Sequence, residues 1–512
     1  MPGPFRFFSK GMCEPTCVHA RYTVYMSDFL DLSTLLVDPA CVVMVPATLA
    51  LRRLVLPLSV VEGTLCVAMA DPSDVATCAR IKHETGFEVK AFRANPEELR
   101  TELLKFYGEH RVGTTSVSAV PDDPVALVDQ LLRTALLRHA SDIHFDPSRE
   151  GVRVRFRTDG VLEEVTRLPS ALQSAVTSRL KVLAGLDIAE RRAPQDGAFT
   201  WRMQGAGAQR LPPLDVRLAT LPVRHGERLT LRLLETDAAR LTFDRLGLLP
   251  EDQRSFERVL SQPHGLVLLT GPTGSGKTTT LYAAIQLLLQ QRPLNVLTVE
   301  DPIEYEIPGV SQAEVDSADK VNFAKALRSL LRHDPDVIMI GEIRDLESLD
   351  AAVKAALTGH LVLSTLHTND AVSAVTRLAD MGLAPHLAAA TLRLSVAQRL
   401  VRALCPRCRE AVPMTEAEAA AFGDPGLAGR MVYRPKGCLA CAGRGYRGRV
   451  GLFELFQPNR EAASRIAAGV PERDLLATAR AAGMKTLAED ALAKCLSGTT
   501  TVQEALRVLG AI

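Results

Sequence analysis

The chain has few of the features that mark membrane-spanning, disulfide-stapled or nucleic-acid-coating proteins. Aromatic residues make up 5 % of its 512 residues, with a single tryptophan, Trp201. No stretch reaches the ~18 consecutive apolar residues of a membrane-spanning helix, and residues 1–10 lack the apolar run of a signal peptide. Ten cysteines are too sparse for a disulfide framework. Lys and Arg number 60 against 59 Asp and Glu, and this net charge of +1 argues against a surface devoted wholly to DNA or acidic lipid.

What the chain does contain is ordinary globular composition in several unlike segments. Apolar residues make up 47 % and charged residues 23 %. At roughly 150 residues per domain, the length predicts three or four domains. Residues 1–110 form the first predicted module: residues 65–69 are expected to form a buried strand, and Asp71 or Ser73 is expected to cap the helix that follows. A Gly-, Thr- and Ser-rich linker is predicted over 111–122.

The second predicted domain, residues 123–236, is α+β and basic. Apolar residues recur at helical spacing over 125–139, and residues 152–156 alternate as a half-buried strand does. The Asp159-Gly160 pair predicts a hairpin turn, and further strands are expected near 161–165, 214–219 and 229–234. Residues 151–233 hold 14 Lys and Arg against 8 Asp and Glu, so this part of a near-neutral chain carries a net charge of +6.

The third predicted domain, residues 245–400, alternates helices with short apolar strands. The strands are expected at 265–270, 295–299, 336–340 and 360–364, and such unbroken apolar runs are typical of a parallel sheet buried on both faces. An insert is predicted over 401–452 and a helical region over 453–512.

A phosphate-binding loop follows the first of these strands and fits G-x-x-x-x-G-K-[ST]. Backbone N–H groups of such a loop and the positive end of the next helix favour phosphate oxygens. Lys277 is expected to reach the β- and γ-phosphates of ATP, and Thr278 to hold Mg²⁺. The predicted nucleotide-binding residues are Gly271, Pro272, Thr273, Gly274, Ser275, Gly276, Lys277, Thr278 and Thr279.

Acidic and histidine-containing segments follow the other strands. Glu342 comes after four apolar residues and is predicted to activate the attacking water, with Gly341 at the usual position of a metal-side Asp. Glu300 ends another strand in an acidic cluster with Asp301 and Glu304. The position of this cluster beside a phosphate-binding loop predicts a catalytic role for Glu300, and a capped turn around Pro302 is the alternative. His367 lies in a polar segment suited to sensing a γ-phosphate; a structural and a functional role for His360 stay equally open.

Four boxes together resemble the secretion ATPases of type II secretion and type IV pilus assembly. They are the phosphate loop at 271–278, the Val-Glu-Asp-Pro-Ile-Glu box at 299–304, the Gly-Glu-Ile-Arg-Asp box at 341–345 and the His box at 359–370, with further matches at 141–144, 155–160 and 192–197. The resemblance implies an α/β fold: a RecA-like P-loop NTPase core with a preceding α+β (PAS-like) domain, an N-terminal α/β module and a tetracysteine zinc insert.

The resemblance also implies that arginines of the basic domain act on the nucleotide. Arg217 and Arg232 occupy those positions, and arginine suits the charge of a transferring phosphoryl group. The alternative is that these strand arginines only face solvent, and for Arg153, Arg155 and Arg157 both interpretations stay open.

Two C-x-x-C pairs separated by 29 residues predict a zinc site. Cys405, Cys408, Cys438 and Cys441 supply four thiolates, a closed tetrahedral set typical of a structural metal. Retraction ATPases of the family typically lack this insert, which disfavours that branch. Cys13, Cys17 and His19 are too irregularly spaced for a second site, and no metal is expected there.

The function implied by the resemblance is a cytoplasmic, hexameric ATPase on the inner membrane that powers type II secretion by pseudopilus assembly. Neighbouring subunits would supply the arginines, and the N-terminal module would dock on the cytoplasmic domain of a platform protein, beside a polytopic one. The alternative within the family is pilus assembly; an Arg-Leu-Gly-x-x-Leu motif for cyclic di-GMP is absent from the N-terminal part. A RecA-like nucleic-acid motor, which would need stacking aromatics, and a non-catalytic nucleotide sensor are the rivals outside it. No nucleic-acid partner is expected.

Overall fold

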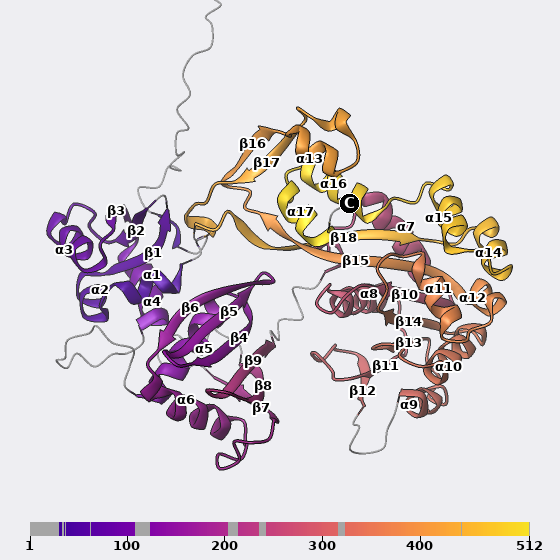
Figure 1. Ribbon diagram of the computed structural model, residues 1–512, viewed down its shortest axis with the longest axis horizontal. Coiled ribbons are helices and arrows are strands. Elements are labelled where there is room, and N and C mark those ends of the chain that lie inside the picture. Colours follow the sequence, from indigo (N-terminus) through magenta and orange to yellow (C-terminus); the bar gives the residue numbers. More distant parts are fainter. Residues whose placement is uncertain are drawn as a thin grey trace, which may run out of the picture.

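The computed structural model describes residues 30–32, 35, 37–61, 63–107, 123–202, 213–234, 242–315, 323–441 and 443–510, built around four β-sheets (Figure 1). The predicted linker over 111–122 lies outside these residues, as do Cys13, Cys17 and His19. Among the described residues, no helix combines the length and apolar character needed to cross a bilayer.

The N-terminal module is a three-stranded sheet in the order β1-β2-β3, with helices packed on it. β2 pairs antiparallel with β1 and parallel with β3, and it confirms the strand predicted over 65–69. Its elements are α1 (Pro39–Met44), α2 (Ala47–Arg53), β1 (Val55–Val61), β2 (Thr64–Met69), α3 (Val75–Thr85), β3 (Glu88–Arg93) and α4 (Pro96–Tyr107).

The start of α3 differs from the prediction. Asp74 is the capping residue, because its carboxylate accepts the Thr77 N–H at 3.0 Å. The predicted caps, Asp71 and Ser73, were wrong: the Asp71 carboxylate accepts the N–H and hydroxyl of Ser73 and so closes a local turn before the helix begins. Such short-range side-chain bonds compete with helix capping.

The second domain is a six-stranded antiparallel sheet in the order β6-β5-β4-β9-β8-β7, with α5 and α6 packed on it. Asp159 and Gly160 both have positive φ, at 50° and 83°, which confirms the predicted hairpin turn. Trp201 lies in this core and donates its indole N–H to Asp129. The elements are α5 (Pro124–Leu137), β4 (Ala140–Ser148), β5 (Gly151–Thr158), β6 (Val161–Leu168), α6 (Ser170–Leu183), β7 (Gln195–Trp201), β8 (Leu214–Val223) and β9 (Gly226–Leu234).

The third sheet has seven strands in the order β12-β11-β13-β14-β10-β15-β18, and all are parallel except the edge strand β18. Every residue of β10, β11, β13 and β14 is buried, as the unbroken apolar runs predicted. The strands are β10 (Gly265–Thr270), β11 (Val296–Glu300), β12 (Val310–Glu314), β13 (Val337–Ile340), β14 (Leu361–Leu366), β15 (Leu392–Leu404) and β18 (Tyr446–Phe456). The helices and turns before and between them are η4 (Phe243–Arg245), α7 (Pro250–Leu260), α8 (Lys277–Gln291), α9 (Phe323–Leu330), α10 (Leu346–Leu357), α11 (Ser373–Asp380) and α12 (Pro385–Thr391).

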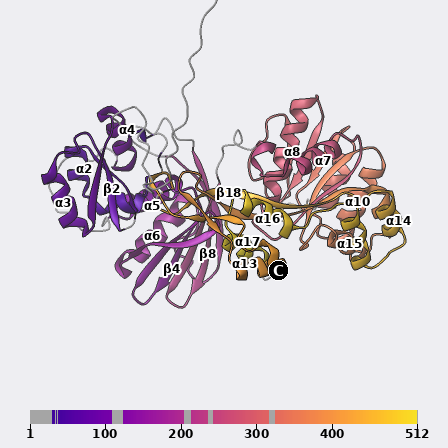
Figure 2. The ribbon, with the colours of Figure 1, turned by 90° about the horizontal axis from the view of Figure 1, so that it is seen from above.

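Between β15 and β18 the chain leaves this sheet and forms the cysteine-containing insert, which in both views reaches toward the N-terminal module (Figure 1 and Figure 2). The insert contains β16 (Arg409–Pro413), α13 (Glu416–Ala421), η5 (Pro425–Leu427), β17 (Met431–Pro435) and η6 (Leu439–Cys441). After β18 the chain is helical, with α14 (Arg460–Ala467), α15 (Glu472–Ala481), α16 (Leu487–Leu496) and α17 (Val502–Leu509).

Candidate nucleotide and metal sites

The phosphate-binding loop joins β10 to α8 at the carboxyl edge of the parallel sheet. Gly274 and Gly276 have positive φ, at 79° and 86°, and so turn the loop as side-chain-bearing residues rarely do. The Ser275 hydroxyl is buried and has no hydrogen-bond partner. Thr278 and Thr279 lie half-buried in the first turn of α8. A glycine-turned loop with one unpartnered buried hydroxyl and a helix start fits a phosphate chain.

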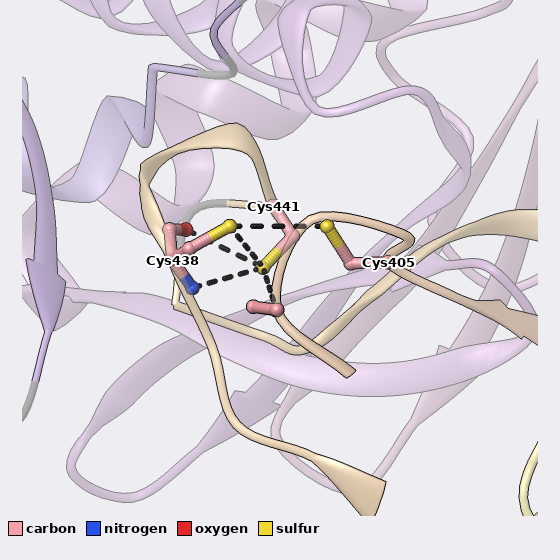
Figure 3. Close-up of side chains that lie close together, drawn as sticks. Cys405, Cys438 and Cys441 are labelled. Carbon is pink, nitrogen blue, oxygen red and sulfur yellow. Dashed lines mark hydrogen bonds between the residues drawn. The ribbon is translucent and has the colours of Figure 1, made fainter. Parts of the chain in front are cut away.

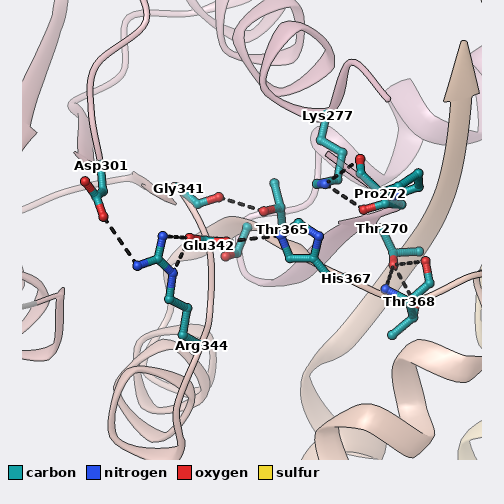
Figure 4. A network of polar contacts seen from close by, with 12 residues as sticks. Thr270, Pro272, Lys277, Asp301, Gly341, Glu342, Arg344, Thr365, His367 and Thr368 are labelled. Atoms are coloured by element: carbon teal, nitrogen blue, oxygen red, sulfur yellow. Dashed lines mark hydrogen bonds and ion pairs between the residues drawn. The ribbon is translucent and has the colours of Figure 1, made fainter. Parts of the chain in front are cut away.

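Lys277 lies inside this loop and is 8 % exposed. Its ammonium donates to the carbonyls of Gly271 at 2.7 Å and Pro272 at 3.2 Å (Figure 4). Burial lowers the pKa of Lys277 to about 8, against the opposing charge of Glu342. The ammonium therefore donates to the loop's own carbonyls, at the place where phosphate oxygens would accept its hydrogen bonds.

Glu342 and His367, for which the sequence predicts separate roles, contact each other beside the loop. The Glu342 carboxylate lies 3.2 Å from Nε2 of His367, and it also pairs with Arg344, whose guanidinium reaches Asp301 at 3.4 Å (Figure 4). The Glu342 side chain is 21 % exposed and that of His367 51 %. A carboxylate and an imidazole in contact at the carboxyl edge of the sheet can orient and deprotonate a water molecule.

Threonines anchor the loop that carries His367. The Thr270 hydroxyl accepts the Thr368 N–H at 2.8 Å, and the Thr365 hydroxyl donates to the Gly341 carbonyl at 2.8 Å. His360, in contrast, precedes β14 at the opposite edge of the sheet, where its Nδ1 lies 3.0 Å from the Ala355 carbonyl oxygen. This contact favours the structural role for His360.

Glu300, like Glu342, lies at the carboxyl end of a strand of the parallel sheet, but its surroundings differ. It is 2 % exposed, and its carboxylate accepts from the hydroxyls of Tyr282 and Thr298 and from the amide of Gln312. Its catalytic role stays a prediction. The contacts observed are those of a carboxylate that fixes the end of β11 beside the site.

Arg217 and Arg232 are directly opposite each other on β8 and β9 and so share one face of the second sheet. Arg217 donates to the carbonyl of Ile303, in the acidic box of the core, at 3.1 Å. Arg232 pairs instead with Asp142 at 3.3 Å and is 62 % exposed. One of the two predicted arginines thus already reaches the core, and the other lies beside it.

The four predicted cysteines form a compact cluster, in which Cys438 is half-buried and the other three are buried; Figure 3 labels Cys405, Cys438 and Cys441. Their Sγ atoms all lie within 4.8 Å of one another, and three of the separations are 3.8 Å. Four thiolates at about 2.3 Å from a tetrahedral zinc would be about 3.8 Å apart. Sγ of Cys441 also accepts the N–H groups of Cys438 and Gly445, at 3.2 and 3.1 Å, which suits a thiolate. The donor set therefore fits zinc held by Cys405, Cys408, Cys438 and Cys441.

Comparison with known proteins decides the family. Residues 121–507 match the family model described as type II/IV secretion system protein, and residues 25–113 match the MshEN domain. The chain belongs to the type II/IV secretion system protein family. This confirms the family predicted from the four boxes, and with it the ATPase class.

Relatives in this family come from both of its assembly branches. The type II secretion system protein HxcR of Pseudomonas aeruginosa is 48 % identical over 75 % of this chain and 77 % of its own length. The type II secretion system ATPase E of Vibrio cholerae is 44 % identical over 75 % of each chain. The type IV pilus assembly ATPase PilB of Myxococcus xanthus is 39 % identical over 91 % of this chain and 86 % of its own.

A solved structure of the family supports the fold. The crystal structure of the pilus retraction motor PilT with bound ADP superposes with a TM-score of 0.51 at 26 % identity, over 74 % of this chain and 96 % of PilT.

Two site residues of this secretion-family ATPase were missed by sequence reasoning. Arg344 pairs with Glu342 and Asp301, and its place in the box at 341–345 was a usable clue. Gln398 on β15 accepts the Thr280 hydroxyl of α8 at 2.8 Å. No local pattern marks Gln398, because its partner is more than a hundred residues away.

Proposed function

We propose that this chain is the cytoplasmic ATPase that hydrolyses ATP to power type II protein secretion by driving pseudopilus assembly through the inner-membrane platform. The observation that carries the proposal is the convergence of Lys277, Glu342 and His367 at one edge of the sheet. The identity of 44–48 % to type II secretion proteins supports the branch.

The residues divide the chemistry of phosphoryl transfer between them. Lys277 leaves the loop carbonyls and binds the β- and γ-phosphates, and the unpartnered Ser275 hydroxyl completes the cradle. Thr278 would hold Mg²⁺, and the ion would neutralise charge on the phosphates. Glu342 accepts a proton from the attacking water, and His367 orients that carboxylate and senses the γ-phosphate side.

Arginines complete the site from outside the core. Arg217 and Arg232 lie on one face of the second domain, and Arg217 already contacts the acidic box. The contact of Arg217 lies within one chain; in a homo-hexamer we infer that these arginines change partner and face the nucleotide of a neighbouring subunit, where they stabilise charge on the transferring phosphoryl group. Zinc in the tetracysteine cluster is structural, because four protein ligands leave no open position.

The proposed location is the cytoplasmic face of the inner membrane. The N-terminal module, whose sheet is separate from that of the core, docks on the cytoplasmic domain of a platform protein. A polytopic platform protein receives the work of domain rotation.

Type IV pilus assembly is the second candidate, and one observation favours it. The alignment with PilB extends over 91 % of this chain, whereas that with HxcR covers 75 %. A pull-down with the full chain as bait distinguishes the two: recovery of a secretion-platform component supports the first, and recovery of a pilus component supports the second.

ATP hydrolysis itself is tested with Lys277→Ala. Loss of the ammonium should lower kcat by roughly 10²–10³-fold, since it removes a charge that acts on the transferring group. The measurement is phosphate release by wild type and variant, each assembled with the platform partner. Equal release by the two proteins would contradict the proposal, and stimulation of turnover by DNA would favour a nucleic-acid motor instead.

A further inference from the structure

Glu454 is a buried carboxylate on the edge strand β18, 4 % exposed, and outside the motifs discussed so far. Its two oxygens bind two different segments. Oε1 accepts the N–H of Ala371 at 2.8 Å, and Oε2 accepts the N–H of Leu487 at 3.2 Å. Opposite Glu454 on β15 is Ala397, whose small side chain leaves that face of the sheet to the carboxylate.

The first segment is the loop that carries His367. Ala371 lies four residues after His367, between β14 and α11. The same loop receives a second support from the core sheet, since Arg399 on β15 donates to the Asn369 carbonyl at 2.8 Å. The Asp370 carboxylate accepts the N–H of Ser373, the first residue of α11, at 2.7 Å. The backbone behind the imidazole is therefore fixed by β15 and β18.

The second segment is the first turn of α16, of which Leu487 is the first residue. Thr486 caps this helix, and β18 runs beside it (Figure 1). Glu454 thus satisfies a donor near the start of α11 and a donor at the start of α16. An anionic side chain is favoured at both places by the helix ends.

We propose that Glu454 is a positioning residue for ATP hydrolysis: it ties the loop of His367 to the start of α16, so that the C-terminal helices set the position of the imidazole. The inference rests on the proposed function, because it assigns His367 a part in the reaction. A carboxylate is required because each of its two oxygens accepts one N–H. In an amide the NH₂ group cannot accept, so one of the two N–H groups would lose its partner.

The test is Glu454→Gln, which keeps the shape and removes one acceptor. We expect kcat to fall on the order of 10–100-fold, since a small misplacement of a catalytic group has effects of this size. KM for ATP should stay near that of wild type, because the phosphate loop is not touched. Hydrogen exchange measured by mass spectrometry should rise in the peptides that contain Ala371 and Leu487.

Asp490→Asn is the matched control. Asp490 is 1 % exposed and lies on the same helix, but its carboxylate accepts from Phe453 N–H and Lys494 and does not touch the loop. We expect this variant to lower the unfolding temperature and to leave kcat unchanged, with no faster exchange at Ala371. If Glu454→Gln proves insoluble, Arg399→Lys alters the other support of the same loop and should also lower kcat.

Two results would overturn the inference. One is wild-type kcat in folded Glu454→Gln, and the other is an equal fall of kcat in Asp490→Asn, which would show a general loss of stability. Lys277→Ala run in parallel separates this outcome from a failure of the proposed function, since a wild type no more active than Lys277→Ala would refute the ATPase itself.

Discussion

The tetracysteine cluster and the phosphate-binding loop both lie beside ends of strands of one sheet. They differ in how many of their polar groups already have partners within the chain. Three of the Sγ separations in the cluster have the 3.8 Å of a tetrahedral site, three of its four cysteines are buried, and Sγ of Cys441 already accepts two backbone N–H groups. In the loop the Ser275 hydroxyl has no partner, Lys277 bonds to the loop's own carbonyls, and His367 is half exposed. A structural site completes its contacts within the chain, whereas a site for a changing ligand leaves them open.

The largest effect, on zinc content and unfolding temperature, is expected from removal of the tetracysteine site. Cys405→Ser with Cys438→Ser should abolish zinc binding and lower the unfolding temperature of the insert by about 10 °C or more, because structural zinc contributes ~10–16 kcal/mol in zinc-finger peptides. Elemental analysis should give one zinc per chain for wild type and none for the variant, and calorimetry gives the stability.

Cys78→Ser is the control for this pair. Cys78 is a free, half-buried thiol of the N-terminal module and lies outside the cluster. It should keep one zinc per chain. Unchanged metal content and stability in the double variant would contradict the structural role.

At the nucleotide site, the two histidines that flank β14 should differ in their effect on kcat. His367→Ala should lower kcat by ~10²-fold, because it removes the partner of Glu342. His360→Ala, at the other edge of the sheet, should leave kcat unchanged. Steady-state ATP hydrolysis measures kcat for both variants. An equal fall of kcat in both would contradict a special role for the carboxyl edge of the sheet.

The smallest effect is the pH dependence of nucleotide binding. Lys277 has its pKa lowered by burial to about 8, so it is protonated below pH 8 and loses its charge above. Affinity for ATP should therefore be constant below pH 8 and fall by up to about tenfold per pH unit above it, with a proton taken up on binding. Calorimetry in buffers of different ionisation enthalpy measures this uptake. Lys277→Arg should bind with little change across the same range, because guanidinium stays charged.

Local patterns predicted most strands of the core and the hairpin at Asp159 and Gly160. They did not predict β15 and β18, because polar and glycine residues interrupt both strands: Gln398, Arg399 and Arg402 in one, and Gly448 and Gly451 in the other. The cap of α3 was missed because Asp71 and Asp74 are equally good caps locally, and the Asp71–Ser73 turn decides between them.

The site was predictable where its residues follow strands within motifs, as Lys277, Glu342 and His367 do. Glu454 was not, since it sits in an apolar run and its two partners lie 83 and 33 residues away. The same holds for Gln398. Contacts that cross a sheet depend on strand order, which no single motif contains.

β15 has a mechanical consequence. Gln398 on this strand bonds to the helix of the phosphate loop, and Cys405 directly follows the last residue of the same strand. At about 3.3 Å per residue, the seven steps from 398 to 405 make a lever of about 23 Å. A tilt of about 10° at its nucleotide end moves the cysteine end by about 4 Å over that length. The insert therefore begins about 23 Å along β15 from the residue that contacts the helix of the phosphate-binding loop.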